Sequence, residues 1–382
     1  MPKLLIVTTV ATTLKAFLLP YAAHFRALGW KVDALAREAS STPECLEAFD
    51  TCHDAAFTRK PWQLKNVKTM NRSIRELVEG QGYDIVHVHT PVAAFMTRFA
   101  LRKHSGKRRP KVIYTAHGFH FFQGGRRLKN TLYLELERQA ALWTDHMIVI
   151  NNEDYSAAFT HSFMPPGRLT LLPGIGLDLA RWNRGAAMAA GTGDVRGELG
   201  LAPEDKLFLM TAEFNPGKRH RDALAALAMT GRRDLHLALA GRGPLEDEMK
   251  ERAEKLGIAK QVHFLGQRND MPSLMLASLA TVLPSEREGL NRSVMESIAL
   301  GVPVLGADAR GIRDLVTTPS RGVLFPVGKP AALAAAMLMM VTEPPRERPT
   351  ADPAWDIHNL LKAHEGIYAA LLGNRGTPES LR

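Results

Sequence analysis

The sequence predicts an α/β protein made of two doubly wound parallel sheets that face a cleft. Short apolar runs recur along the whole chain, and each is followed by a turn signal and a helical pattern, which is typical of strand–helix–strand units. Most of these runs are continuously apolar, as expected of strands that are buried on both faces of a sheet. The length of 382 residues suits two domains better than one.

The expected strands form two sets, one in each half of the chain. They are short, bounded by turn residues, and far enough apart for a crossover helix between them. In the first half they are LLIVTTV (4–10), KVDALA (31–36), DIVHVHT (84–90), KVIYTAHG (111–118) and HMIVIN (146–151). In the second half they are LFLMTAEF (207–214), LHLALAGRG (235–243), VHFLG (262–266), ATVLPS (280–285) and VPVLGAD (302–308).

A seam rich in proline and glycine, residues 169–182, separates the two halves. We therefore expect an N-terminal Rossmann-like domain of residues 1–172 and a C-terminal one of residues 177–350. The stretch 183–200, just after the seam, reads as a surface loop. Residues 354–372 carry apolar side chains at helical spacing, and we expect this helix to cross back to the N-terminal domain.

The composition excludes several classes of protein. A formal net charge of +10 favours a nucleic acid, an anionic membrane surface or a phosphorylated ligand as partner. A nucleic acid is disfavoured, because the chain lacks interleaved aromatic residues, zinc-ligand spacing and a recognition-helix motif. Cys45 and Cys52 show no metal-ligand spacing and indicate a reducing compartment. No apolar run approaches the roughly 20 residues that span a bilayer, and the N-terminal run reads as a strand rather than a signal peptide, so we expect a cytoplasmic protein.

Two glutamates, Glu288 and Glu296, follow the expected strand at residues 280–285. Glu288 falls on a loop, and a helix begins near Asn291, which places Glu296 about one turn inside that helix. Helical side chains lean towards the helix N-terminus, where free N–H groups attract phosphate. A carboxylate only accepts hydrogen bonds, so its natural neutral partner is a pair of hydroxyls.

A nucleoside diphosphate sugar fits this arrangement, because its phosphates lie between two sugars that carry diols. Glu296 would hold the ribose, and Glu288 the transferred sugar. The structural alternative is that Ser293 and Glu296 form a capping box, with Glu288 as a solvated loop residue. No glycine-rich dinucleotide fingerprint follows the first strand, which disfavours an NAD enzyme.

The spacing of the two glutamates resembles the E-x7-E motif of glycosyltransferase family 4, whose members are retaining enzymes of the GT-B fold. The resemblance extends over nearly the whole chain and is to bacterial members that build cell-surface polysaccharides and glycans. It implies transfer from a nucleoside diphosphate sugar, with UDP expected and GDP or ADP as alternatives, to a glycan or lipid-linked acceptor on the N-terminal domain. The stretches that carry it are VIYTAHGFHFF (112–122), LTLLPGIGLD (169–178), LALAGRGPLEDEM (237–249) and VHFLGQRNDMPSLM (262–275).

The resemblance also assigns roles to individual residues. The catalytic candidates are His117, which would reach the donor sugar, Lys218, which would hold the diphosphate, and Glu288. Family members add an arginine to the lysine, but this chain has Glu213 at that position, and Arg219 or the helix N-terminus could substitute. No metal or cofactor is expected, because no D-x-D stretch is present. The predicted donor-binding residues are Lys218, Arg219, Arg242, Glu288, Gly289, Leu290, Asn291 and Glu296.

Further residues of the N-terminal half are candidates for the acceptor side. The turn at residues 8–15 would form an acceptor wall, and His120 and Phe121 are expected to face the acceptor or the core. His87 and His89 alternate along one strand and so share a face of the sheet. Since no third ligand has metal spacing, we expect them to pack or hydrogen-bond rather than bind a metal.

Two basic clusters, residues 102–111 and 124–129, also lie in this half. They could dock the protein on the anionic inner face of the cell membrane, near a lipid-diphosphate acceptor. The alternative is an ordinary helix of the fold followed by a solvated loop. Two other functions stay open at this point: a nucleotide-sugar epimerase on the same fold, and a catalytically silent partner subunit, which the glutamate at position 213 permits.

Overall fold

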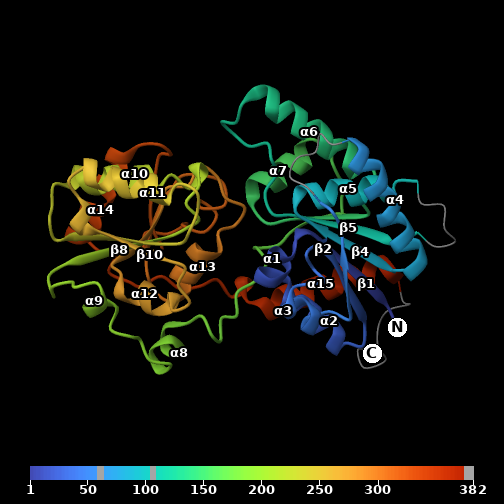
Figure 1. Ribbon diagram of the computed structural model, residues 1–382, viewed down its shortest axis with the longest axis horizontal. Helices are drawn as coiled ribbons and strands as arrows, with labels where there is room; N and C mark the ends of the chain where they lie inside the picture. Colours follow the sequence, from blue (N-terminus) through green and yellow to red (C-terminus); the bar gives the residue numbers. More distant parts are fainter. Residues whose placement is uncertain (58–63, 104–108, 374–382) are drawn as a thin grey trace. The chain divides into compact units, whose positions relative to one another are not determined.

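The computed structural model divides into two compact units. One comprises Met1–Ile175 and the segment from His358 onward, and the other comprises Gly176–Ile357. Each unit contains one parallel sheet with helices on its faces (Figure 1). The structure describes residues 1–57, 64–103 and 109–373.

The first unit is built on a seven-stranded sheet in which the paired strands run parallel. The order is β3-β2-β1-β4-β5-β6-β7, so the winding reverses between β1 and β4. The sequence does not predict the edge strands β3 and β7, because β3 has few apolar residues and β7 has only three residues in all. The strands are β1 (Lys3–Val10), β2 (Lys31–Arg37), β3 (Thr51–Asp54), β4 (Ile85–His89), β5 (Lys111–Ala116), β6 (His146–Val149) and β7 (Leu169–Leu171).

Helices cover both faces of this sheet (Figure 1). On one face, apolar residues of α4 and α5 such as Ile74 and Ala93 pack against Val86 of β4. On the other face, Tyr368 of the C-terminal helix stacks on Phe25 of α2, with ring centroids 4.8 Å apart, so this helix belongs to the first unit as expected. The helices are α1 (Ala11–Thr13), the π-helix η1 (Leu14–Leu18), α2 (Leu19–Ala27), α3 (Pro43–Ala48), α4 (Leu64–Gln81), α5 (Pro91–Leu101), α6 (Arg127–Ala141), α7 (Asn152–Thr160) and α15 (Ile357–Leu372).

The prediction of a turn at residues 8–15 is wrong. β1 continues to Val10, and a helix begins directly at Ala11 and passes into the π-helical turn of η1. Ala11 and Leu14 are buried, and this burial explains the helix, because their apolar side chains hold it against the sheet.

The second unit has a six-stranded parallel sheet of order β10-β9-β8-β11-β12-β13, which reverses between β8 and β11. The sequence does not predict β13, which has only four residues and begins at a glycine. The strands are β8 (Lys206–Thr211), β9 (Leu235–Ala240), β10 (Val262–Gly266), β11 (Ala280–Leu283), β12 (Val304–Ala307) and β13 (Gly322–Phe325).

Helices of the second unit also cover both faces of its sheet, with an apolar core on each side. The stretch 183–200 is not a plain loop, because the side chains of Asn183 and Asp194 cap two short helices, α8 and α9. The helical segments are α8 (Arg184–Ala189), α9 (Val195–Glu198), η2 (Pro216–Lys218), α10 (His220–Thr230), α11 (Glu246–Lys255), η3 (Ala259–Gln261), α12 (Met271–Ala277), α13 (Arg292–Ala299), α14 (Pro330–Thr342) and η4 (Pro353–Trp355).

The predicted fold class of two doubly wound parallel sheets is confirmed. Strand residues are buried on both faces, which explains why the strands read as continuous apolar runs rather than alternating ones. Within the described ranges, no helix combines the length and the apolar character that a membrane span requires.

Candidate functional site

The strand order of each sheet indicates where a ligand would bind. In doubly wound sheets, ligands bind beyond the carboxyl ends of the strands at the point where the winding reverses. In the second unit these strands are β8 and β11. The predicted residues Lys218 and Glu288 lie in the connections that follow those two strands, Lys218 as the last residue of η2 and Glu288 on a loop.

Lys218 and Glu288 are 70 residues apart in sequence and form a direct ion pair, with Nζ 2.6 Å from Oε1. The pair is largely withdrawn from solvent, since the side chains of Lys218 and Glu288 are 23% and 10% exposed. Two charges this close, with little water around them, hold each other in place more firmly than a surface pair would. The site therefore combines one cation for an anionic ligand with one carboxylate for hydroxyls.

Two further contacts tie these loops together. The backbone N–H of Glu286 donates to the carbonyl of Gly217 at 2.9 Å, and Nη1 of Arg219 donates to the Glu286 carboxylate at 2.7 Å. Nε of Arg219 also donates to Asp222 at 2.6 Å. Arg219, predicted as a phosphate ligand, thus has its guanidinium on two carboxylates of its own unit.

Arg310 supports the Glu288 loop and was missed by sequence reasoning. Its Nε donates to the carbonyl of Glu288 at 3.0 Å, and its own carbonyl accepts from the Glu288 N–H at 3.2 Å. The next residue, Gly311, has a φ of 76°, and a Cβ there would lie 2.1 Å from the carbonyl oxygen of Gly289. The signal in the sequence is the Arg-Gly pair just after β12, which only acquires meaning once β11 and β12 are known to be neighbours.

The helix that follows Glu288 begins where the sequence predicts. Asn291 is the N-cap of α13, and its side chain accepts from the N–H of Val294. The capping-box alternative is wrong, because Ser293 donates to the Asn291 side chain and Glu296 accepts from Nε of Arg292 at 2.8 Å. Burial raises the pKa of the Glu296 carboxyl, although Arg292 opposes the shift. Among the described contacts, none joins Glu296 to Lys218 or Glu288.

The glycine turn after β9 has a structural explanation. A Cβ on Gly241 would lie 2.1 Å from the carbonyl oxygen of Ala212, and one on Gly243 would lie 2.6 Å from backbone atoms of Phe214. Both glycines thus let this turn pack against the loop after β8. Arg242 between them is exposed.

Glu213, at the position of the family arginine, is exposed and accepts a hydrogen bond from the Asn215 side chain at 3.0 Å. Two buried hydroxyls lie at or just beyond the carboxyl ends of the switch strands β8 and β11. They belong to Thr211 and Ser285, and neither has a hydrogen-bond partner within the described part of the chain. Buried polar atoms without partners are rare, so these two hydroxyls are candidates for contact with a ligand.

The predicted residue of the first unit, His117, follows β5 and is half-buried. Its Nε2 lies 3.0 Å from Nδ1 of His89 at the end of β4, and the two rings stack with centroids 5.3 Å apart. The His89 ring also packs against that of His87, with centroids 4.1 Å apart and planes tilted by 32°. Burial lowers the pKa of His117 to about 4 and holds the pKa values of His87 and His89 well below their ordinary range. As predicted, His87 and His89 pack and hydrogen-bond.

A surface pocket of about 380 Å³ opens between α6 and α7 of the first unit. Phe121 and Phe122 line it together with Asn130, Leu134 and Glu153. Phe121 is also part of the core, which is one of the two places expected for it. Its ring stacks on Phe119, with centroids 4.9 Å apart.

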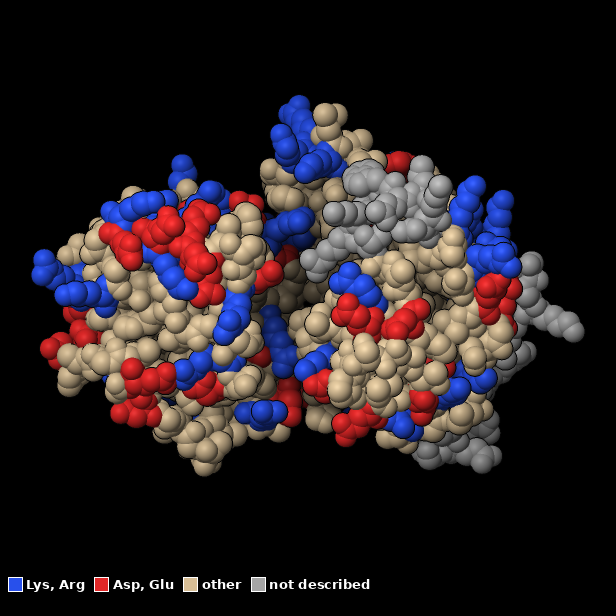
Figure 2. Space-filling model, viewed as in Figure 1, with Lys and Arg blue, Asp and Glu red and all other residues tan. Residues whose placement is uncertain are grey.

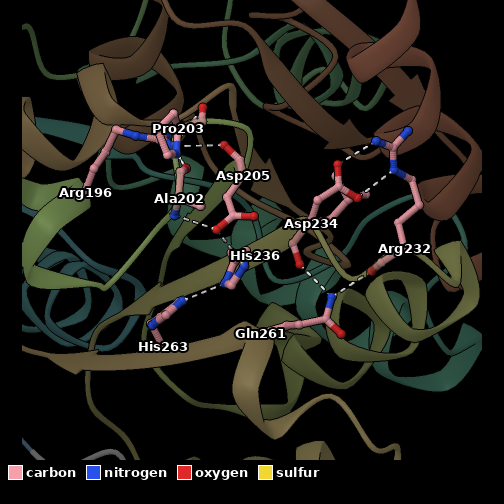
Figure 3. Close-up of polar contacts among 10 residues, drawn as sticks. Arg196, Ala202, Pro203, Asp205, Arg232, Asp234, His236, Gln261 and His263 are labelled. Carbon is pink, nitrogen blue, oxygen red and sulfur yellow. Dashed lines mark hydrogen bonds and ion pairs between the residues drawn. The ribbon is translucent and has the colours of Figure 1, made fainter.

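A second polar network lies at the opposite, amino ends of β8, β9 and β10 (Figure 3). Nδ1 of His236 is 3.0 Å from Nε2 of His263, and Nε2 of His236 is 3.5 Å from the Asp205 carboxylate. Arg232 pairs with Asp234 beside it. No ligand is expected at this end of a parallel sheet.

Both halves of the chain match family models. Residues 17–181 match the model described as Glycosyltransferase Family 4, and residues 193–352 match the model described as Glycosyl transferases group 1. The matched segments contain all of the predicted catalytic residues: His117 in the first, and Lys218 and Glu288 in the second.

Individual relatives agree with these matches. The chain is 32% identical to EpsD of Bacillus subtilis (strain 168), a protein assigned as a glycosyltransferase, over 90% of this chain and 88% of the relative. It is 29% identical to the UDP-Gal:alpha-D-GlcNAc-diphosphoundecaprenol alpha-1,3-galactosyltransferase of Escherichia coli, over 69% and 67% of the two chains. The crystal structure of Anabaena Alr3699/HepE in complex with UDP and glucose has a similar fold, with a TM-score of 0.76 at 18% identity over 97% of this chain and all of that one.

Proposed function

Since this chain belongs to glycosyltransferase family 4 and has the GT-B fold, we propose that it transfers a sugar from a UDP-sugar to a lipid-linked glycan acceptor, with retention of anomeric configuration. The observation that carries this proposal is the ion pair of Lys218 and Glu288, 2.6 Å long, at the switch point of the second sheet. UDP as the nucleotide is supported by the Anabaena structure in complex with UDP and glucose, and the lipid-diphosphate acceptor by the galactosyltransferase of Escherichia coli.

Lys218 and Glu288 compensate each other while the site is empty. A bound diphosphate would offer Lys218 a second anion, and a sugar hydroxyl would offer Glu288 a donor. The pair would then separate or be shared at little electrostatic cost, because each charge keeps a partner. Arg310 would keep the Glu288 backbone in position during this exchange, since it holds both the N–H and the carbonyl of that residue.

In the chemical step, the bond between the anomeric carbon and the diphosphate oxygen breaks, and the acceptor hydroxyl forms its bond from the same face. The proton of that hydroxyl passes to the leaving diphosphate oxygen. Lys218 stabilises the charge that develops on the leaving group, and Glu288 orients the sugar without attacking it. His117 contributes a neutral ring beside the sugar. No metal or cofactor takes part in this scheme.

Transfer assays with two site variants and two matched controls test the proposal. UDP-glucose, UDP-galactose and UDP-N-acetylglucosamine are offered with a lipid-diphosphate-linked saccharide, and product and released UDP are measured. Lys218→Ala and Glu288→Gln should each lower transfer about 100-fold. Lys218→Ala should also weaken UDP binding, whereas Glu288→Gln should not. Lys250→Ala and Glu246→Gln, which remove a surface ion pair of the same unit, should leave transfer unchanged.

The outcomes separate the competing functions. Near-normal transfer by both site variants would remove Lys218 and Glu288 from the site. Conversion of the donor sugar without acceptor would indicate an epimerase, and binding of UDP-sugar without any turnover would indicate a silent subunit. The anomeric configuration of the product, determined by NMR, decides between retention and inversion.

A membrane surface as partner is supported by α6 of the first unit. Leu128 and Leu132 lie one helical turn apart on it and are 88% and 54% exposed, with Leu136 exposed one turn further on. Arg126, Arg127 and Lys129 lie around the start of the same helix, and Figure 2 shows basic side chains gathered there. Apolar and basic side chains on one helix fit the interface of an anionic bilayer. Residues 104–108 of the other predicted basic cluster lie outside the described residues.

Vesicle sedimentation tests this surface. A Leu128→Glu/Leu132→Glu variant should bind phosphatidylglycerol vesicles at least tenfold more weakly than wild type, because it loses two apolar contacts and gains two negative charges. Leu46→Glu is the matched control, since Leu46 is equally exposed, at 54%, on α3 of the same unit. Equal binding by both variants, or equal binding of wild type to phosphatidylcholine vesicles, would contradict docking through α6.

A further inference from the structure

The contact between His89 and His117 bears on which of their ring nitrogens carry protons, as well as on where the rings lie. The contact joins Nδ1 of His89 to Nε2 of His117 at 3.0 Å. It leaves Nδ1 of His117 as the ring nitrogen available to a ligand. A neutral imidazole has one N–H and one acceptor nitrogen, so one ring must donate here and the other must accept.

The other nitrogen of His89 decides the direction. Nε2 of His89 is buried and has no hydrogen-bond partner among the described residues. If the proton sat on Nε2, an N–H group would be buried without an acceptor, which native structures rarely tolerate. The favoured arrangement puts the proton on Nδ1, so that His89 donates to Nε2 of His117. His117 must then carry its own proton on Nδ1.

The contacts and burial of the His87, His89 and His117 rings indicate that these rings are held in place and are uncharged. His87 is held at both nitrogens, with Nδ1 2.6 Å from the Tyr368 hydroxyl and Nε2 2.7 Å from the Thr115 hydroxyl. Its ring packs against that of His89, with centroids 4.1 Å apart and planes tilted by 32°, and this contact restricts the His89 ring. Burial keeps the pKa values of these rings below neutrality, so no ring carries a second proton at pH 7.

We propose that His89 is a positioning residue that holds His117 as the tautomer protonated on Nδ1, so that His117 presents an N–H donor to an oxygen of the transferred sugar. This inference rests on the proposed role of His117 in sugar transfer. A donor in place before the sugar arrives costs no rearrangement when charge develops at the anomeric centre. His89 itself touches no substrate in this scheme.

The tautomer is measured by ¹⁵N NMR of histidine-labelled protein without ligand. In wild type, Nδ1 of His117 should resonate as a protonated nitrogen and Nε2 as an unprotonated one. The reverse pattern would overturn the inference. Because the NMR measurement does not depend on turnover, it tests the His117 tautomer independently of the transfer assays with the Lys218 and Glu288 variants.

Three variants test whether the hydrogen bond or only the packing matters. His89→Asn places an amide N–H₂ where Nδ1 lies and keeps the donor, so transfer should stay within about threefold of wild type. His89→Leu removes the donor, and kcat should fall about tenfold with little change in KM for the UDP-sugar. Tyr368→Phe removes a hydrogen bond of the stack that does not reach His117; it should lower the melting temperature and leave the His117 tautomer unchanged.

A purely structural role gives the opposite order. Leucine suits a buried site better than asparagine does, so activity that follows the melting temperature would place His89→Leu above His89→Asn. That order would overturn the positioning role, as would an unchanged kcat in His89→Leu. A His89→Asn variant with normal kcat and a preserved His117 tautomer would support it.

Discussion

Two histidine pairs of this chain have the same local geometry and lie at opposite ends of their sheets. Nδ1 of His89 lies 3.0 Å from Nε2 of His117, with ring centroids 5.3 Å apart and planes at 27°. For His236 and His263 the corresponding values are 3.0 Å, 5.3 Å and 25°. The contact between the rings therefore does not distinguish a candidate site from a structural feature.

The surroundings of the two pairs do distinguish them. Nε2 of His236 faces the Asp205 carboxylate at 3.5 Å, at the amino ends of the strands (Figure 3). Nε2 of His89 is buried and has no partner in the described part of the chain, and His117 lies beyond the carboxyl end of β5. These two features, the end of the sheet and the unpartnered atom beside the ring, favour His117 over His263 as the candidate site residue.

The largest expected difference between the two units is in their response to acid, which should lower the free energy of unfolding of the first unit more than that of the second. The ring of His364 lies beside that of His87, with centroids 5.7 Å apart. Burial lowers the pKa of His364 to about 4, and lowers those of His87 and His89 well below their ordinary range. Unfolded histidines titrate near pH 6.5. Between pH 6.5 and about 4 the unfolded chain therefore binds protons that the native first unit does not, and the free energy of unfolding falls as the pH falls. His364 alone should contribute a loss of roughly 3 kcal/mol.

Urea unfolding followed by segment-resolved hydrogen exchange, between pH 7 and pH 4.5, measures this effect in each unit. The second unit should lose less, because His220 is its one strongly shifted histidine among the described residues, with a pKa lowered by burial to about 4. His364→Leu removes one titrating ring and should flatten the pH dependence of the first unit. Equal losses in both units would contradict the comparison.

The next largest difference is expected between the two histidine pairs, in the effect that a substitution in each has on transfer activity. His117→Ala removes the neutral donor at the proposed sugar site, and transfer should fall about 100-fold. His263→Ala removes the equivalent ring of the second pair and should change transfer less than twofold, because that pair lies at the amino ends of the strands. The assay is the UDP-sugar transfer described above. A similar fall in both variants would mean that the effect is on stability rather than on the site.

Most of this fold can be predicted from the sequence, because parallel strands that are buried on both faces consist of continuous apolar runs. It misses β3, β7 and β13, which have few residues and obtain their stability from pairing with a neighbour rather than from their own pattern. The helix directly after β1 is missed for a related reason. Its apolar residues, such as Leu14, resemble the end of a strand until the face on which they pack is known.

The candidate residues that belong to a single sequence motif can be predicted, whereas the contacts between residues of different loops cannot. The E-x7-E spacing and the lysine after β8 identify Glu288 and Lys218, but their ion pair depends on β8 and β11 being neighbours in the sheet. The same holds for Arg310, which reaches Glu288 from the loop after β12. His87 and His89 were expected to pack or hydrogen-bond, yet the partner of each nitrogen follows only from the folded positions of β4, β5 and α15.

The smallest effect is expected at Asp205, whose carboxylate is what the second pair has and the first lacks. Asp205→Asn keeps an acceptor for the N–H of Ala202, 2.7 Å away, but removes the charge that faces His236. The contact is long, at 3.5 Å, and is an ion pair only when His236 is protonated, so the free energy of unfolding should fall by less than about 1 kcal/mol, and transfer should not change. The urea midpoint and the transfer rate measure these two effects. A large loss of transfer would show that the amino ends of the second sheet influence the site, and the distinction between the two pairs would then fail.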